Sequence, residues 1–357
     1  MKKVSKKTGP VELTGRCCYV GVDVHKATYY VSILAEDGTR REFSTSADPD
    51  ALLYTLLSKM GVHVLCLAHE SGPTGYGLAW ACQEAGVPVI VAASSRIARP
   101  IAASGKTDRL DCMKLADYLA KNMLKSIAIP NRKDHAFREL VRKGSKISKS
   151  RSKLRQEIKS FLLKNGLAEP EGLQHWSSSS VEQLRAMMLP HALRATLDLL
   201  LDEYDFLATQ IAKAKILQKS VIAQDGKQES IKNLQTIPGV GEVISTIFLA
   251  EIFQPGRFET SGQVCAYAGL APIISQSGSS KSTARLRSVG QKQLRCSLVE
   301  GAWMWMAKEP AAKALYNRIR GKTNLPQKAI IAVARKLLIV LWRIAVENRP
   351  YRLSTAV

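Results

Sequence analysis

The sequence predicts an N-terminal α/β domain of the ribonuclease-H type (RuvC-like), followed by an α-helical coiled-coil arm and a mainly α-helical C-terminal domain. Three observations support this prediction. Short β-rich segments alternate with helical ones near the start, a long basic stretch without proline follows, and a Pro-Gly-Val-Gly turn opens the last third. The predicted domains cover residues 1–128, 129–222 and 223–357.

The first domain is expected to hold five strands and three helices. Three β-rich segments separated by turn-sized gaps come first, and helix, strand, helix, strand and helix follow. This is the element order of a ribonuclease-H-like domain, although many α/β domains share pieces of it. The strands are expected at 17–24, 28–35, 40–46, 62–68 and 87–93, and the helices at 49–61, around 77–86 and at 108–122.

The second region is strongly basic. Residues 131–164 carry 12 Lys or Arg against three acids and read as one long helix, which is either a solvated face or a phosphate-binding surface. A second amphipathic helix over 181–221 follows, with Pro190 expected to interrupt it near its start. Two long helices joined by a loop predict an antiparallel hairpin or coiled-coil arm and a site of subunit contact.

The third region opens on LQTIPGVGEVIS, which is typical of a helix-hairpin-helix element. Gly239 and Gly241 would allow a tight turn that exposes N–H groups to a phosphate, unless the segment is an ordinary turn between two helices. A small, polar and basic segment lies further on at 275–295, with five serines in its first eight residues. The apolar stretch near the C-terminus is expected to be a core helix.

The charge balance predicts a polyanionic partner. Fifty-two Lys and Arg against 30 Asp and Glu give a formal net charge of +22, which favours nucleic acid over a basic protein with no such partner. No apolar run reaches the roughly 18 residues of a membrane span, and no signal-peptide pattern is present. The seven scattered cysteines form no C-x-x-C pair, so we expect reduced thiols in the prokaryotic cytosol.

Four acids are candidates for one metal site. Asp23 lies in the apolar run of the first strand, and Glu70 follows a buried strand at its carboxyl end, where ligands gather in α/β sheets. Asp108 and Asp111 are three residues apart on one helix, so they share a face. Oxygen ligands without His or Cys suit Mg²⁺ or Mn²⁺, and two such ions stabilise both oxygens of a phosphodiester displacement.

Each acid also has a simpler interpretation when it is taken alone. Asp108 could cap its helix, and Asp111 could pair with Arg109 or Lys114. Their joint occurrence in this element order, in so basic a chain, favours the metal site. His25 and His69 neighbour two of the acids, but adjacent strand residues point to opposite faces, so neither is counted as a ligand.

An ordered set of motifs resembles the transposases of DEDD-type insertion sequences, the Piv-invertase-like recombinases. The matching segments are GVDVHK, HESGPTGYG, GKTDRLDCMKLA, IPGVGEVIS and GLAPIISQSGSSKS, and they cover nearly the whole chain. The chain has Glu70-Ser71-Gly72-Pro73 where many relatives have a sequence like E-A-T-G, which changes the loop but keeps the carboxylate.

The resemblance implies a function and its residues. Asp23, Glu70, Asp108 and Asp111 would bind divalent metal, and Ser277, among several neighbouring serines, would be the nucleophile of a DNA recombinase. The family is also thought to form tetramers and to use an element-encoded noncoding RNA as a guide. The expected partners are therefore double-stranded DNA, a guide RNA and further copies of the chain, as a dimer or tetramer.

Two other functions stay open from the sequence. One is a metal-dependent, structure-specific nuclease of RuvC type in which water attacks, and the other is a binding protein without enzymatic activity. For any of the three functions, the candidate nucleic-acid contacts are Lys106, Arg109, Arg142, Lys143, Lys146, Lys149, Arg151, Lys153, Arg155, Gly239, Gly241, Lys281, Arg285 and Arg287.

Overall fold

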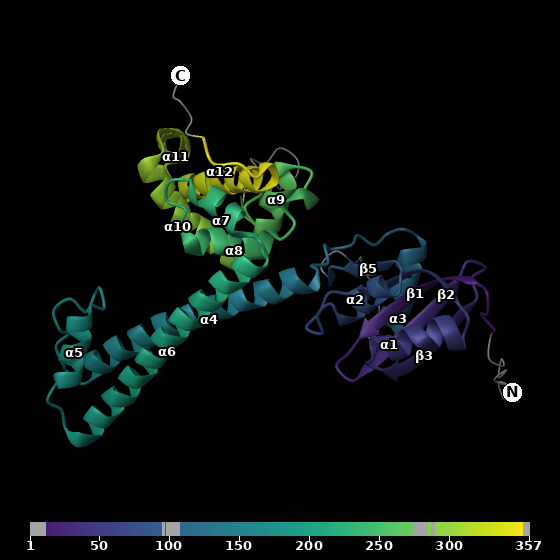
Figure 1. Ribbon diagram of the computed structural model, residues 1–357, viewed down its shortest axis with the longest axis horizontal. Coiled ribbons are helices and arrows are strands. Elements are labelled where there is room, and N and C mark those ends of the chain that lie inside the picture. Colours follow the sequence, from purple (N-terminus) through teal and green to yellow (C-terminus); the bar gives the residue numbers. More distant parts are fainter. Residues whose placement is uncertain (1–11, 95–96, 98–107, 274–284, 287–289, 353–357) are drawn as a thin grey trace. The chain divides into compact units, whose positions relative to one another are not determined.

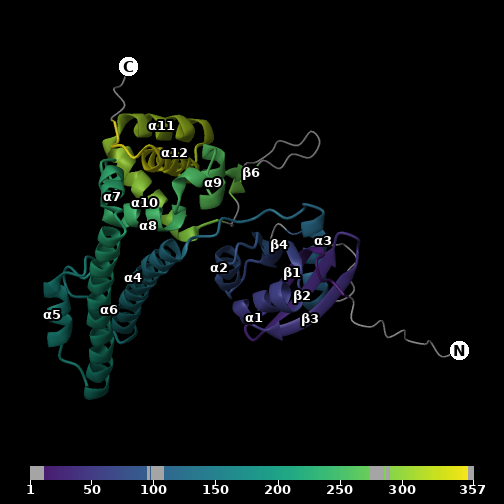
Figure 2. The same ribbon diagram turned by 45° about the vertical axis from the view of Figure 1, so that its right-hand side comes forward.

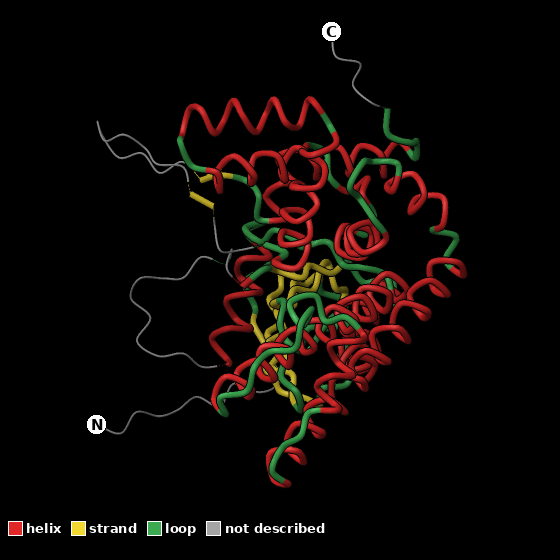
Figure 3. Tube along the Cα trace, turned by 90° about the vertical axis from the view of Figure 1, so that its left-hand side faces the viewer, coloured by secondary structure: helices red, strands yellow, loops and turns green. Residues whose placement is uncertain are grey.

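The computed structural model describes residues 12–94, 97, 108–273, 285–286 and 290–352. It divides the chain into two compact units, Met1–Asn131 and Arg132–Val357 (Figure 1). The first unit contains the main sheet. Within its described residues, the second unit is helical apart from one short strand pair. Figure 3 shows the helices in red and the strands in yellow.

The first unit is built on a five-stranded mixed sheet, as predicted. Its order is β3-β2-β1-β4-β5, in which β1 and β2 pair antiparallel, as do β2 and β3, while β4 runs parallel to both β1 and β5. The two parallel pairs bring the carboxyl ends of β1 and β4 to the same edge of the sheet. The strands are β1 (Cys17–Val24), β2 (Thr28–Ala35), β3 (Arg40–Ser46), β4 (His63–Glu70) and β5 (Val89–Ala92).

Helices cover both faces of this sheet. Helix α1 (Pro49–Tyr54), which continues as a π-helical turn (Thr55–Lys59), and α2 (Gly77–Glu84) share one core with the apolar side chains of β1, β2 and β4. Helix α3 (Asp108–Ala120) packs on the other face, where Leu115 and Leu119 join Ala68 of β4 in a smaller core. The sheet is therefore the middle of three layers.

One glycine allows α3 to approach the sheet closely. A Cβ on Gly21, in the middle of β1, would lie 2.5 Å from the backbone nitrogen of Ala116 and closer still to the carbonyl oxygen of Cys112. Both atoms belong to the backbone of α3, so they cannot move aside as a flexible side chain would. Only glycine fits at this position, and α3 is thereby held over the carboxyl half of β1.

Two ion pairs attach the flanks of α3 to the sheet. Arg40 at the start of β3 pairs with Asp117 and also donates to the Ser32 hydroxyl over 3.0 Å. Nearer the N-terminus of the helix, Arg109 Nε donates to Glu42 of β3 over 2.5 Å. These pairs fix the direction of α3 across the strands, although at partly exposed sites each stabilises the fold only modestly.

The second unit begins with a pair of long antiparallel helices. They are α4 (Arg132–Lys164) and α6 (His191–Gln224), which lie side by side in Figures 1 and 2. The antiparallel direction shows in the contacts, since Gly144 lies against Gln218 while Arg155 bonds to Tyr204. Pro190 precedes α6 as its N-cap, so the predicted interruption is confirmed.

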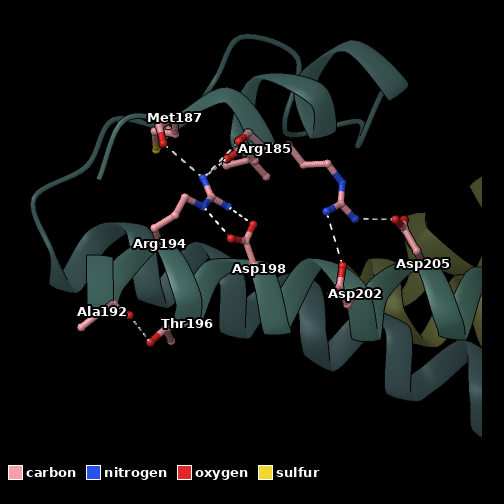
Figure 4. A network of polar contacts seen from close by, with 9 residues as sticks. Arg185, Met187, Ala192, Arg194, Thr196, Asp198, Asp202 and Asp205 are labelled. Atoms are coloured by element: carbon pink, nitrogen blue, oxygen red, sulfur yellow. Dashed lines mark hydrogen bonds and ion pairs between the residues drawn. The ribbon is translucent and has the colours of Figure 1, made fainter. Parts of the chain in front are cut away.

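The tip of this arm has its own core and polar network. Arg194 holds Asp198 of α6 and also donates to the carbonyl oxygens of Leu184, Arg185 and Met187 at the end of α5 (Ser178–Ala186) (Figure 4). Arg185 of α5 in turn reaches Asp202 and Asp205 of α6. The carbonyl oxygens at the C-terminal end of α5 thus accept hydrogen bonds from Arg194, which joins α5 to α6 at the tip of the arm.

The rest of the second unit is a helical bundle around a large apolar core, into which the first turns of α4 also insert Phe137 and Val141. The predicted apolar helix near the C-terminus is confirmed as α12, which contributes Leu337, Leu338 and Leu341 to that core. None of the described helices is long and apolar enough to span a membrane. The bundle contains α7 (Gln228–Gln235), α8 (Glu242–Ile252), a 3-10 turn (Pro255–Arg257), α9 (Ser261–Ala268), α10 (Lys292–Lys308), α11 (Pro310–Thr323) and α12 (Pro326–Glu347), with the short strands β6 (Pro272–Ile273) and β7 (Arg285–Leu286).

Replacing Gly21 should test the close approach of α3. We expect Gly21→Ala to lower the free energy of unfolding of the first unit by about 1–3 kcal/mol or more, because the methyl group must push α3 off the sheet. Urea unfolding followed by circular dichroism measures this loss. Gly77→Ala is the matched control, since a Cβ there meets nothing within 4 Å, and an equal loss in both variants would contradict the account.

Candidate active site

Asp23 and Glu70 lie side by side on the face of the sheet that α3 covers. Gly21 touches α3, and because strand side chains alternate, Asp23 two residues later points to the same face. Ala68 packs in the core under α3, so Glu70 two residues later shares that face too. Val22 pairs with His69 in the parallel register, which brings the residues that follow them, Asp23 and Glu70, to neighbouring positions at the sheet edge.

Helix α3 brings the other two predicted acids toward this edge. It begins at Asp108, one helical turn before Cys112, and Asp111 lies one turn before Leu115. Leu115 is buried against the sheet, so Asp111, one turn before it, belongs to the sheet-facing side of the first turn. Asp111 is half-buried there, while the description of Asp108 covers its backbone only.

Sequence reasoning set His25 aside, yet it contacts Asp23 directly. His25 Nε2 lies 3.1 Å from Asp23 Oδ2, and the imidazole packs edge-on against Tyr30 at 5.7 Å. Alternation separates only adjacent residues. Position 25 is two residues from Asp23, so it lies on the same side of the chain, just after the end of β1 at Val24. The i to i+2 spacing of Asp and His was the signal that could have identified this contact.

His69, in contrast, belongs to the opposite face. It is 1% exposed, its Nδ1 lies 3.0 Å from the backbone oxygen of Glu70, and burial lowers its pKa below the usual value. A neutral imidazole in this place is a core residue. Leaving His69 out of the ligand set agrees with where its side chain lies.

The cations beside the acids only partly neutralise them. Lys114 Nζ is 3.8 Å from Asp111 Oδ1, which is the long end of an ion pair, and Arg109 is engaged with Glu42 instead of Asp111. Glu42 comes from β3, so a fifth carboxylate borders the region. Near the start of α3, Asp111 thus has a long ion pair with Lys114, and the Arg109 guanidinium is paired with Glu42.

The donor set suits a hard divalent cation. Asp23, Glu70 and Asp111 offer carboxylate oxygens only, which is the chemistry that Mg²⁺ and Mn²⁺ prefer. Among the described side chains, no three His, Cys, Asp or Glu lie close enough together to hold a metal ion. Asp23, Glu70 and Asp111 are all described, so these three carboxylates do not form such a cluster, and the Asp108 carboxylate is not among the described side chains.

Several predicted residues lie outside the described part of the chain. They are Lys106, Ser277, Lys281 and Arg287, while Arg285 is described only through its backbone in β7. Described residues lie on both sides of the segment with Ser277. They are the strands β6 and β7, which pair through Pro272–Leu286 and Ile273–Arg285. Gly290 then packs against Gly269, and a Cβ on it would come within 2.6 Å of the Gly269 nitrogen.

Two of the predicted phosphate contacts on α4 have protein partners, as Arg109 does on α3. Arg142 makes a bidentate pair with Glu251 of α8, Nε–Oε1 2.7 Å and Nη2–Oε2 2.9 Å, and Glu251 is 1% exposed. Arg155 stacks over Trp176 at 5.2 Å and donates to the Tyr204 hydroxyl. Since a buried carboxylate requires its cation, Arg142 serves the fold here, and Arg155 likewise holds the tip of the arm.

The other predicted cations of α4 remain available to solvent. Lys143, Lys146, Lys149 and Lys153 are exposed, and Arg151 is half-buried with its guanidinium 5.9 Å from the centre of the Tyr204 ring. The basic helix thus divides its cations, since those facing α6 and α8 are structural while the lysines face outward. An outward row of lysines fits a phosphate backbone as well as plain solvent.

The glycines of the predicted helix-hairpin-helix element have different surroundings. Gly239 has φ +85°, and a Cβ there would lie 2.8–2.9 Å from atoms of Met304 and Trp305, so it packs against α10. Gly241 is the N-cap of α8 and has nothing within 4 Å of a built Cβ. Only Gly241 leaves space at a helix N-terminus that a phosphate could approach.

Known proteins are similar to this chain along most of its length. Residues 20–165 match a family model described as a transposase of the DEDD, IS110 kind, and residues 231–317 match the transposase family IS116/IS110/IS902. The y4qE protein of Sinorhizobium fredii, named as a transposase, is 28% identical over 96% of this chain and 94% of its own.

Two further relatives are more distant. The pilin gene-inverting protein of Moraxella lacunata is 26% identical over 69% of this chain and 68% of its own. The transposase for insertion sequence element IS1328 of Yersinia enterocolitica is 23% identical over 71% of this chain and 76% of its own.

The thiol beside the acids should report on how tightly α3 is packed. Cys112 is 1% exposed, and burial together with Glu42 and Asp23 raises its pKa to about 11. The thiol form is therefore favoured in the folded protein, so its contribution to stability is complete below the unfolded thiol pKa of about 8.5 and lost as the pH rises through 11. Between about pH 8.5 and 11, we expect the melting temperature of the wild type to fall relative to that of Cys112→Ala. A difference in melting temperature that stays constant over this pH range would contradict the expectation.

Proposed function

We propose that the chain is a DEDD transposase of the IS110/IS116 kind, whose family models match residues 20–165 and 231–317, and that it is a recombinase that cuts and rejoins DNA with a metal-assisted serine nucleophile. One observation carries the proposal. Asp23 and Glu70 occupy the same face at the carboxyl ends of two neighbouring parallel strands, and α3 begins over that face with Asp108 and Asp111.

The four acids would bind the metal ion that assists strand cleavage. Asp23, Glu70, Asp108 and Asp111 would hold Mg²⁺ or Mn²⁺. When bound, such ions polarise the scissile phosphate and neutralise the charge that develops on its oxygens. His25, hydrogen-bonded to Asp23, orients that carboxylate, as the partners of metal ligands commonly do.

Ser277 would be the nucleophile that cuts the strand and keeps it joined to the protein until it is rejoined. Its hydroxyl oxygen attacks phosphorus, the bond from phosphorus to one sugar oxygen breaks, and the serine proton leaves to solvent or a basic group. The product is a serine–DNA phosphodiester, which keeps the energy of the broken bond for the reverse attack by another DNA hydroxyl. Among the described residues on either side of Ser277, β6 pairs with β7 and Gly290 packs against Gly269.

The partners follow from charge and family. Double-stranded DNA is the substrate, and the outward lysines of α4 (Lys143, Lys146, Lys149 and Lys153) with Arg151 form a surface for nucleic acid, including a noncoding guide RNA. Lys106, Arg109, Lys281, Arg285 and Arg287 would contact phosphates near the acids and the serine, and Gly241 would do so through the start of α8. A dimer or tetramer would let one copy supply the acids and another the serine.

Replacing Asp111 tests the role of the acids in strand cleavage. We expect Asp111→Asn to lower the rate of strand cleavage by about 100-fold or more, because even residues that only support a metal ligand matter by 10–100-fold. Cleavage of labelled DNA carrying the element ends, in Mg²⁺, measures the rate. Asp50→Asn, an exposed acid in the first turn of α1, is the matched control and should cleave normally. Equal cleavage by wild type and Asp111→Asn would reject the metal site.

Replacing Ser277 separates recombination from simple cutting. A nicked substrate that releases its leaving strand should trap a covalent protein–DNA adduct with the wild type, and Ser277→Ala should form none, whereas Ser280→Ala should still form it. If Ser277→Ala cuts and joins strands normally, water attacks and the chain is a RuvC-type nuclease in mechanism. If no variant or wild type breaks a strand with Mg²⁺, the chain only binds nucleic acid.

A further inference from the structure

Helix α11 carries a strongly basic surface. Between Glu309 and Glu347 the chain contains eight Lys or Arg and no acid. Four of these cations, Lys313, Arg318, Arg320 and Lys322, are exposed on α11 and define what we call the α11 surface. No ion pair joins any of the four to a carboxylate among the residues that the structure describes.

The α11 surface has an ordered layout. Arg318 and Lys322 are four residues apart and form one row, and Lys313 and Arg320, seven apart, form another. The stripe between the rows holds Asn317 and Gly321, which are also exposed. The opposite side of the helix packs into the bundle through Ala312 and Tyr316. Two rows of cations thus flank a strip with little side-chain bulk.

Gly321 is hard to explain from the protein alone. A Cβ built on it meets nothing within 4 Å, whereas at Gly144 and Gly301, the other glycines well inside described helices, a neighbouring side chain lies within 2.6 and 2.7 Å. Those two glycines allow helices to approach, but Gly321 allows no such contact. A helical glycine is less favourable than alanine by about 1 kcal/mol, so this position gives up stability without a packing reason inside the chain.

Helix-dipole effects account for only part of the pattern. Arg320 and Lys322 lie in the last turn of α11, where cations stabilise the helix end. Lys313 lies near the N-terminus, where a cation is unfavourable, and the dipole explains neither Arg318 nor the glycine. Asn324 already provides the left-handed residue that ends the helix, with φ +51°, so Gly321 is not needed for that purpose.

We propose that the α11 surface binds the phosphodiester backbone of duplex DNA, with the two rows of cations on its phosphates and Gly321 allowing close approach. The partner rests on the proposed function, because a transposase acts on DNA, but the binding itself does not depend on the acids or on Ser277. Glycine where a foreign backbone comes near, flanked by Arg and Lys, is an arrangement suited to this ligand.

The glycine gives a test in which stability and binding move in opposite directions. In the full chain without divalent metal, we expect Gly321→Ala to raise the melting temperature by about 1–4 °C and to weaken the Kd for a duplex of about 30 base pairs roughly fivefold. Fluorescence anisotropy and thermal unfolding measure the two quantities. Gly262→Ala, an exposed helical glycine in the first turn of α9, should leave the Kd unchanged. An unchanged Kd in Gly321→Ala would overturn the proposal.

The cations give a second, independent measurement. The slope of log affinity against log salt should become shallower by about 1.8 in Arg318→Gln/Lys322→Gln, since each phosphate contact contributes about 0.9. Lys59→Gln/Lys121→Gln removes the same charge from exposed sites of the first unit and should change the slope less. Equal slopes in the two double variants, or a loss confined to single-stranded RNA, would overturn the assignment to duplex DNA. Because no cleavage is measured, failure here leaves the proposed chemistry untouched.

Discussion

The close approach of α3 to β1 is the constraint on which the candidate active site depends. Gly21 leaves the backbone of Cys112 and Ala116 nearly in contact with the strand, and any side chain would separate them. This contact fixes the height of α3 above the sheet, and the pairs of Arg40 with Asp117 and of Arg109 with Glu42 fix its direction. The first turn, with Asp108 and Asp111, therefore begins beside the edge where Asp23 and Glu70 stand.

Much of this arrangement was predictable, because strands and helices leave periodic patterns. Short β-rich segments separated by turn-sized gaps predicted β1, β2 and β3 at their observed bounds. The period of two in a strand then puts Asp23 and Glu70 on the face of Gly21 and Ala68. The contact of His25 with Asp23 was missed, because the rule for adjacent residues does not apply to residues two positions apart. Residues i and i+2 of an extended segment share one side of the chain.

Contacts between residues far apart in the sequence were the other feature that could not be predicted. In sequence, Arg142 is one of twelve cations along a basic helix, and nothing local distinguishes it from Lys143. The structure separates them, because Glu251 lies 109 positions later and is buried opposite Arg142. Arg142 also donates to Gln291, just beyond the Ser277 segment, over 3.3 Å. A buried carboxylate therefore decides which cation of the arm is structural, and this choice appears only in the folded chain.

We propose that Asp23, Glu70, Asp108 and Asp111 form one site for a divalent ion, so the chain should bind Mn²⁺ through these carboxylates. Titration of the full chain without DNA, followed by the electron paramagnetic resonance signal of free Mn²⁺, reports the affinity. The account predicts that Asp23→Asn, Glu70→Gln and Asp111→Asn each weaken binding, while Asp117→Asn, on the same helix but paired with Arg40, binds as the wild type does. Unchanged affinity in all of the first three variants would contradict it.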